Sequence, residues 1–439
     1  MNVLGDRRGM PIMGRTFQLS AIGSILLAVF VLTCCASAKG SGVGLQYEGC
    51  LSEGTVGCDS TGMAAGLLKY SGLVLSPDSS TAYAVGSRLI ATYDRPNRSH
   101  LAAAGCWSSL EIDGSGCEIL PNDTLTGADA VISPDGKHLY QSGRSVALTS
   151  LDRGSDGTLS YGGCLAIKGS FGCRGNVPRP VFGLGVGLDV SPDNRNVYAA
   201  IWDGYAIYRQ PAHGHLKFQG CINKKGIRGC RKLPNLDLAP GGILVTPDGG
   251  TALGISAFTI SVYSRGVRGN LRYRGCWGMA RRTRECAKPP AGTNHTLTGV
   301  RIGPSGNNLY IVSRERGAIL TFRILKSSRL RYVGCISYHG LRGCDPAPGD
   351  HLHRPYNLQM APSGRSFYVN LTDSPTLERY DLGPGGKLQY AGCMSEDPES
   401  DCEVVDMSPS NITLATISND GESYYFGYGG NWSIFSPED

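Results

Sequence analysis

The chain has 439 residues, with 62 Gly and 24 Pro, only 18% charged residues and a formal net charge of +6. This composition excludes a protein built on long surface helices and favours many short strands joined by turns. The length suits one large all-β domain or two to three smaller domains.

The N-terminal segment 1–38 has the features of a secretory signal peptide. Three arginines precede an apolar run of 15 residues at 21–35, and the small residues 36–38 form a signal-peptidase site ahead of Lys39. We therefore expect cleavage after residue 38 and a single mature domain over 39–439.

Two alternatives to cleavage remain open. The uncharged run 16–38 is long enough to stay in a membrane as an anchor. Cys34 and Cys35 suggest a lipidation site. All three alternatives place residues 39–439 outside the cytoplasm, so we expect a secreted or extracytoplasmic protein.

A short motif ending in Gly-Cys recurs along the rest of the chain, and its cysteines are 55 to 59 residues apart. A period held over six intervals indicates a repeat architecture. The seven copies are LQYEGC (45–50), LAAAGC (101–106), LSYGGC (159–164), LKFQGC (216–221), LRYRGC (271–276), LRYVGC (330–335) and LQYAGC (388–393).

A second motif recurs in phase with the first. In it, alternating apolar residues lead into a turn of the Ser/Thr-Pro-Asp-Gly type, and a strand follows, which predicts a β-hairpin. Its copies are LVLSPD (73–78), AVISPDG (130–136), LDVSPDN (188–194), ILVTPDG (243–249), VRIGPSG (300–306), LQMAPSG (358–364) and VVDMSPSN (404–411).

Each repeat therefore supplies four short strands, and seven four-stranded antiparallel units predict an all-β, seven-bladed β-propeller. The chain begins with the last strand of a repeat, at 45–50, and its final repeat supplies the other three. We expect the N-terminal strand to complete the final blade and close the ring. The segment 431–435 is the alternative candidate for that position.

The cysteines pair in sequence within each repeat. In an exported chain, an even and repeating set of cysteines predicts one structural disulfide per repeat rather than a redox site. Metal binding is the less favoured alternative, because no second Cys or His recurs with each pair. The expected disulfides are Cys50–Cys58, Cys106–Cys117, Cys164–Cys173, Cys221–Cys230, Cys276–Cys286, Cys335–Cys344 and Cys393–Cys402.

The repeats GKLQYAGC and SPDGKHLY resemble the YVTN/lactonase-like seven-bladed β-propeller superfamily over residues 44–430. Some members of that superfamily are lactonases, and others are binding or scaffolding proteins. The resemblance implies either a metal-independent, lactonase-type hydrolase with its site at the central channel or a non-enzymatic binding module. We expect no metal and no cofactor, because no GxSxG, Walker or HExxH motif occurs.

Polar residues that interrupt the apolar inner strands, or that lie on the loops entering them, are the candidate ligand-binding residues, since charges inside a propeller need partners or ligands. A lactonase mechanism would use His353, with Arg354 and Asp189, to activate water and stabilise an oxyanion. The alternative is that Arg301 pairs with an Asp and the histidines lie on solvated loops. The candidates are Arg179, Asp189, His295, Arg301, His353, Arg354 and Asp406.

Charge is strongly segregated along the chain. Residues 214–335 contain 21 Lys or Arg against 4 Asp or Glu, a net of +17, whereas residues 336–439 have a net of −10. The basic sector predicts binding to an acidic polysaccharide, a cell-surface polymer or an acidic protein. Nucleic acid is not expected, and a membrane would be contacted only through an uncleaved N-terminal segment. The candidate basic surface is Lys224, Lys225, Arg272, Arg274, Arg281, Arg282 and Arg331.

Overall fold

The fold is known from a computed structural model of the chain. The N-terminal segment 1–38 and five of the candidate residues (Arg179, Arg281, Arg282, His295 and Asp406) lie outside the described residues. The structure describes residues 42–52, 58–60, 72–86, 88–109, 116–121, 125, 129–142, 147–166, 172–173, 177, 187–201, 204–211, 215–226, 230–233, 241–280, 285–290, 296–349, 351–372, 374–405, 414–428 and 431–438.

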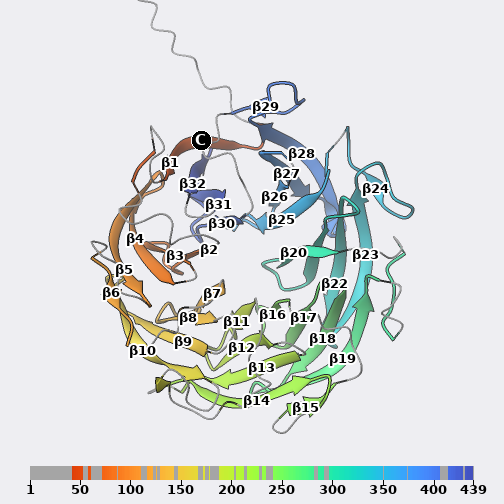
Figure 1. Cartoon of the computed structure of the whole chain (residues 1–439). Helices are drawn as coiled ribbons and strands as arrows, with labels where there is room; N and C mark the ends of the chain where they lie inside the picture. Colours follow the sequence, from red (N-terminus) through yellow and green to blue (C-terminus); the bar gives the residue numbers. More distant parts are fainter. Residues whose placement is uncertain are drawn as a thin grey trace, which may run out of the picture. The chain divides into compact units, whose positions relative to one another are not determined.

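The described strands form seven sheets arranged as blades around a common centre (Figure 1). The predicted all-β, seven-bladed propeller is confirmed. Blade 1 contains β2 (Gly72–Leu75), β3 (Thr81–Val85), β4 (Leu89–Asn97), β5 (His100–Ser108) and β6 (Glu118–Ile119). Blade 2 contains β7 (Asp129–Ile132), β8 (His138–Ser142), β9 (Ala147–Arg153) and β10 (Leu159–Ala166). Blade 3 contains β11 (Leu188–Val190), β12 (Asn196–Ile201), β13 (Gly204–Arg209), β14 (Lys217–Asn223) and β15 (Cys230–Lys232).

The next three blades repeat this order from the inner to the outer strand, and β28 is preceded by one 3₁₀ turn, η4 (Pro384–Gly386). Blade 4 contains β16 (Ile243–Val245), β17 (Thr251–Ile255), β18 (Thr259–Arg265) and β19 (Leu271–Gly278). Blade 5 contains β20 (Leu297–Ile302), β21 (Asn308–Ser313), β22 (Ala318–Leu325), β23 (Arg329–Ser337) and β24 (Asp345–Pro346). Blade 6 contains β25 (Pro355–Met360), β26 (Ser366–Leu371), β27 (Thr376–Leu382), β28 (Leu388–Ser395) and β29 (Glu403–Val404).

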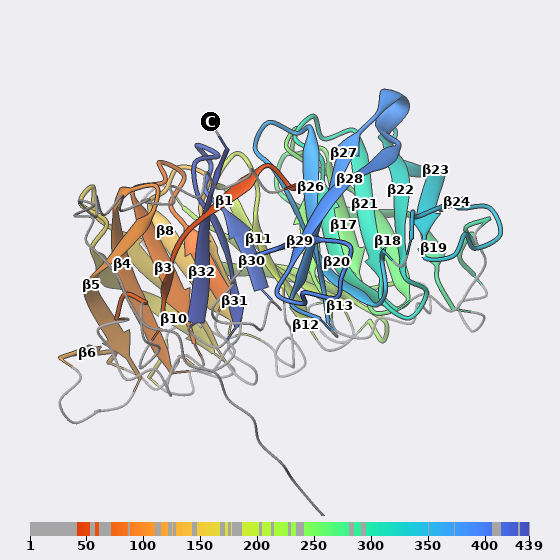
Figure 2. The same ribbon diagram turned by 90° about the horizontal axis from the view of Figure 1, so that it is seen from above.

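Blade 7 joins the two ends of the domain, as predicted. Its strands are β30 (Leu414–Ile417), β31 (Tyr424–Tyr428), β32 (Asn431–Pro437) and β1 (Leu45–Leu51), in that order. The segment 431–435 belongs to β32, the third strand, and β1 pairs with it as the outer strand. Figure 2 shows β1 lying along β32.

The hairpin predicted at 404–411 in this blade is wrong. Val404 lies in β29 of blade 6, and the inner strand of blade 7 is β30, which pairs with β31 through the turn 418–421. That turn reads Ser-Asn-Asp-Gly and has no proline, so the proline-based pattern selected an earlier segment. Asp406 was chosen from the misplaced hairpin.

The turn with Ser or Thr two residues before Asp recurs with or without proline, and it has a clear physical basis. In five blades the hydroxyl of its first residue donates to the Asp carboxylate two positions later and accepts the amide proton of the second strand. For example, Ser191 Oγ lies 2.6 Å from Asp193 Oδ1 and 3.0 Å from Asn196 N. One side chain thus fixes both the turn and the register of the hairpin.

All seven predicted disulfides are present, one for each repeat. In blades 1, 3, 5 and 6, the segment after the outer strand returns beside it as a short parallel fifth strand. In blade 3 the two bonded cysteines, Cys221 and Cys230, are direct partners in this parallel pair. Seven disulfides are typical of a protein that folds in an oxidising compartment.

The glycine before each outer-strand cysteine also has a structural role. The outer strands bulge at this motif, for example between Tyr47 and Gly49. Gly49 has φ of 151°, which residues with a side chain rarely adopt.

The hydrophobic core is divided into clusters between neighbouring blades. Each joint contributes one cluster, for example Leu253, Val262, Leu309 and Phe322 between blades 4 and 5. Similar clusters connect the other six joints, including blade 7 with blade 1. The ring is therefore held together by burial between adjacent sheets. No helix long and apolar enough to cross a membrane occurs in the described part of the chain.

Candidate functional site

The central channel is bordered by the inner strand of each blade. One edge of this strand pairs with the second strand of the blade, and the other edge has no strand partner among the described residues. A free strand edge presents unpaired N–H and C=O groups. Asp129 Oδ2 accepts the amide proton of Leu188 at 2.7 Å, and Asp189 Oδ2 accepts that of Val245 at 2.6 Å. Each carboxylate thus accepts a hydrogen bond from a backbone amide of the inner strand in the next blade.

Arg301 and Gln359 continue the same pattern on the other side of the ring. Arg301 Nε donates to Gln359 Oε1 at 3.0 Å, and Arg301 Nη1 donates to the carbonyl of Val300 at 2.9 Å. The side-chain amide of Gln359 in turn donates to the carbonyl of Ala415 in blade 7. Arg301 and Gln359 therefore connect the inner strands of blades 5, 6 and 7 through side-chain hydrogen bonds.

The channel residues are also coupled through their charges. Burial raises the pKa of Asp189 to about 7 and that of Asp129 to about 6. The negative charge of Asp129 further raises the pKa of Asp189, whereas Arg301 lowers the pKa of Asp129. Both aspartates are half-buried as whole residues. Two carboxyls that titrate near neutrality beside an arginine form a candidate acid–base site.

The sequence analysis predicted Asp189 and Arg301 for this cluster but missed Asp129. Asp129 lies at the start of β7, one residue before the segment that was assigned to the hairpin motif. Asp129 could have been recognised from its position, because residues 129 and 131 lie on the same face of one strand.

His353 and Arg354 lie apart from the channel carboxyls in their contacts. Both side chains are exposed. The His353 ring lies 5.4 Å from the ring of Tyr338, and the carbonyl of Arg354 accepts the Thr372 hydroxyl at 2.8 Å. Among the described residues, no contact joins either side chain to Asp129, Asp189 or Arg301.

A second polar cluster lies beside this loop, in blade 6. Glu378 is fully buried in β27, and its carboxylate accepts the amide proton of Leu352 and the hydroxyl proton of Tyr380. His351 lies 3.3 Å from Glu378 and stacks on Tyr390. His351 and Asp401 also approach Cys393 and Cys402, but those cysteines form a disulfide and are therefore not available as metal ligands.

Three residues of the predicted basic surface, Arg272, Arg274 and Arg331, lie on the outer strands of blades 4 and 5. Lys217, Arg272 and Arg331 occupy the same position of the repeat in β14, β19 and β23, and all three are exposed. Figure 1 shows these strands following one another along the outer edge of the domain. In the other four blades this position is Gln46, Ala102, Ser160 and Gln389. We call Lys217, Arg272 and Arg331 the basic rim.

The structure also describes Lys224, Lys225 and Arg274 of the predicted surface. Arg274 is exposed and donates to Ser264 Oγ at 2.9 Å, Lys225 is exposed and Lys224 is half-buried. Within the described residues, no carboxylate forms an ion pair with any cation of the basic rim.

The fold is similar to that of several solved bacterial propellers. The periplasmic gluconolactonase of Pseudomonas aeruginosa shares 18% identity over 76% of this chain and 85% of its own, with a TM-score of 0.53. A putative 6-phosphogluconolactonase of Bacteroides uniformis shares 15% identity over 72% and 82% of the two chains, with a TM-score of 0.51. A putative 6-phosphogluconolactonase of Bacteroides fragilis gives 16%, the same coverages and 0.50. The predicted likeness to lactonase-like seven-bladed propellers is thus confirmed at the level of the fold.

No protein-family model matches the sequence, and no curated protein matches it. At the identities given above, the structural likeness establishes the architecture and leaves the activity to be argued from the residues.

Proposed function

We propose that the protein is an exported, disulfide-stapled propeller that binds polyanions through the basic rim. The observation that carries this proposal is the repetition of a cation at one repeat position in three consecutive blades. Neighbouring outer strands then present a row of positive charge to one linear acidic polymer. Lys or Arg at equivalent positions suits an acidic polysaccharide better than a single small anion, because each blade adds one contact.

Export is supported by two features. The seven disulfides are typical of extracytoplasmic proteins. The segment 1–38 has the pattern of a signal peptide. An acidic cell-surface polymer would be accessible to a protein in that location.

The test is binding to a heparin matrix as a model sulfated polysaccharide. We expect the triple variant Lys217→Gln, Arg272→Gln and Arg331→Gln to bind at least about tenfold more weakly at low salt, since each exposed cation contributes modestly. The dependence of affinity on salt should also become shallower, because fewer counterions are released.

A matched control changes the net charge equally without touching the basic rim. Gln46→Glu, Ser160→Glu and Gln389→Glu alter the same repeat position in blades 7, 2 and 6, where the side chains are exposed. We expect this triple variant to keep most of its affinity. Equal losses in the two triple variants would show that net charge alone governs binding and would reject the proposal.

Lactone hydrolysis in the channel is the second candidate. It is favoured by the pKa of Asp189, raised to about 7 by burial and by Asp129, and by Arg301, whose positive charge lowers the pKa of Asp129. The Asp189 carboxylate would take a proton from water while the water oxygen attacks the lactone carbonyl. Arg301 would stabilise the oxyanion, the ring C–O bond would break, and the leaving alkoxide would receive the proton.

This candidate predicts a specific pH profile for hydrolysis of sugar-acid lactones. The rate should rise as Asp189 loses its proton, reach half its maximum near pH 7 and level off at higher pH, since only the ionised carboxylate acts as a base. Asp189→Asn should lower the rate by about 100-fold or more. His353→Ala should leave it unchanged, so a loss confined to that variant would assign the chemistry to the segment 351–355, which we call the HLHRP loop. No turnover across a panel of lactones would reject both assignments.

A further inference from the structure

An inter-blade contact recurs at three joints of the propeller. An arginine at the end of the third strand reaches the turn aspartate of the preceding blade: Arg95 pairs with Asp420 at 2.6 Å, and Arg153 with Asp78 at 3.1 Å. Arg265 pairs with Asp193 at 2.9 Å. All three arginine side chains are buried, at 5 to 6% exposure. We call this contact the latch.

At two of the three joints, the arginine of the latch also donates a hydrogen bond to the hydroxyl of a buried tyrosine in the preceding blade. Arg153 Nε donates to Tyr83 Oη at 2.9 Å, and Arg265 Nε donates to Tyr198 Oη at 2.7 Å. Each tyrosine hydroxyl then donates to a glycine carbonyl of the following blade. The contact is therefore a small buried network rather than a surface ion pair.

The joint between blades 2 and 3 lacks the latch, as do the two joints where Ile324 and Leu382 occupy the arginine position. Between blades 2 and 3 the arginine position is Gln210, and the expected partners of an arginine there are Asp135 and Tyr140. Tyr140 is fully buried, and its hydroxyl finds no hydrogen-bond partner among the described residues. The side-chain oxygen of Gln210 is buried without a partner as well. Buried polar atoms without a hydrogen-bond partner are unusual in native proteins.

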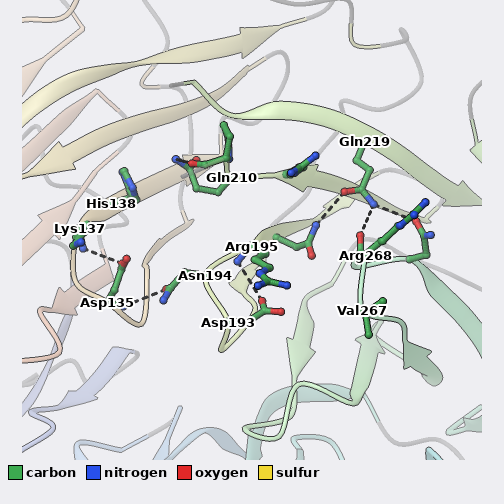
Figure 3. A pocket seen from close by; sticks show the side chains of 14 residues that line it. Asp135, Lys137, His138, Asp193, Asn194, Arg195, Gln210, Gln219, Val267 and Arg268 are labelled. Atoms are coloured by element: carbon green, nitrogen blue, oxygen red, sulfur yellow. Dashed lines mark hydrogen bonds between the residues drawn. The ribbon is translucent and has the colours of Figure 1, made fainter. Parts of the chain in front are cut away.

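A hollow of about 840 Å³ opens at this joint (Figure 3). Its lining comes from the turns of blades 2 and 3, the end of β13, β14, and the β18–β19 turn of blade 4. The cations that line it are Lys137, Arg195, Arg209 and Arg268. None of them forms an ion pair within the described residues. The volume is in the range of small-ligand sites.

The other lining groups define the chemistry of the ligand. Asn194, Gln219 and Asn270 supply amides, and Asp135 supplies an exposed carboxylate that can accept hydroxyl protons. Guanidinium groups suit carboxylates, which they bind through two parallel hydrogen bonds. Among the described residues, the lining contains no Phe, Tyr or Trp side chain on which a nucleobase could stack.

We propose that this hollow binds a short acidic saccharide, whose carboxylates contact the arginines and whose hydroxyls contact the amides and Asp135. The site contains none of the basic-rim residues and none of the channel carboxyls. It therefore stands independently of the proposed function, and a ligand of three sugar units is too short to test the polymer-binding proposal by itself.

The central experiment is to restore the missing latch. Gln210→Arg places an arginine where Arg153 and Arg265 lie in their blades, so we expect it to reach Asp135 and Tyr140 and to occupy part of the hollow. We expect this variant to unfold at the same or a higher temperature than the wild type. We expect its affinity for trigalacturonic acid, measured by calorimetry at low salt, to fall by about tenfold or more. Because the fold is retained, misfolding cannot account for the loss.

Two further variants localise the ligand. Arg209→Ala should weaken trigalacturonic acid binding by about tenfold, because it removes a cation that lines the hollow. The fold should be unaffected, since the Arg209 side chain is exposed and forms no ion pair with the described residues. Lys326→Ala removes an exposed cation outside the hollow and should bind as the wild type does. The neutral trisaccharide maltotriose should not bind, and inorganic phosphate should compete only weakly.

Four outcomes would overturn the proposal. Three of them are no binding of trigalacturonic acid to the wild type, equal binding of maltotriose, and undiminished binding to Gln210→Arg, and the fourth concerns phosphate. Loss of heparin binding in the basic-rim variant with retained trisaccharide binding would separate the two sites. Binding of phosphate as tightly as the trisaccharide would show a general anion site and would also reject the saccharide assignment.

Discussion

Replacing Arg265 by alanine is expected to lower the free energy of unfolding by about 3 kcal/mol, because the change leaves several buried partners unpaired. The guanidinium donates to Tyr198 Oη at 2.7 Å, to both oxygens of Asp193 at 2.9 Å and to Asn196 Oδ1 at 3.0 Å. Its side chain is only 5% exposed, so water cannot replace these bonds without opening the joint.

The loss should depend on pH. Burial alone would raise the pKa of Asp193, but the Ser191 hydroxyl and Arg265 outweigh it and hold that pKa below its ordinary value. The stabilisation from this carboxylate is therefore present above the unfolded-state pKa near 4, and it is lost as the pH falls through the lower native-state pKa. Urea unfolding at pH 7 and below pH 3, with the disulfides intact, measures both values.

Two controls make this measurement specific to the latch. Arg268→Ala removes a cation three residues away that is exposed and makes no ion pair among the described residues, so we expect a change within about 0.5 kcal/mol. Arg265→Gln reproduces the natural sequence of blade 3 in blade 4 and should destabilise the protein by about 2 kcal/mol. Equal stability of Arg265→Ala and wild type would show that the latch does not hold the blades together.

The fold could be predicted almost completely because each blade repeats its information. The Gly-Cys motif fixes an outer strand with its bulge, and the Ser-Pro-Asp turn fixes an inner hairpin. Seven copies of these two motifs at a nearly constant spacing are compatible with one architecture, the seven-bladed propeller. Blade 7 was the exception because its turn at Ser418 lacks proline, so the same hydrogen bonds arise from a different sequence.

The sites could be predicted only in part, since they depend on which blades lie side by side. Asp189 and Arg301 were identified because they interrupt an apolar strand. The meaning of Gln210 could not be read from its own repeat, because it depends on a tyrosine and an aspartate of the preceding blade. A comparison of the repeats at the position of Arg153 and Arg265 would have found the missing latch.

Buried charge without a repeating pattern is the other feature that escaped prediction, and Glu378 is the clearest case. It lies in β27, the third strand of blade 6, and is fully buried. Its carboxylate accepts the amide proton of Leu352 at 3.0 Å and the hydroxyl proton of Tyr380 at 2.7 Å. Leu352 has φ of 66°, a conformation that costs free energy for a residue with a side chain, so Glu378 holds the loop in place.

We expect Glu378→Ala to lower the free energy of unfolding by about 3 to 5 kcal/mol, because it creates a cavity and leaves buried donors unpaired. Adding Tyr380→Phe to Glu378→Leu should recover part of this loss, since removing both polar partners avoids an orphaned hydroxyl. Glu399→Ala, an exposed change in the same blade, should shift stability by at most about 0.5 kcal/mol. Urea unfolding measures all three. If Glu378→Ala unfolded at the wild-type midpoint, the buried carboxylate would not be what fixes the HLHRP loop, and the loop would have to be held by the His351 stack on Tyr390 instead.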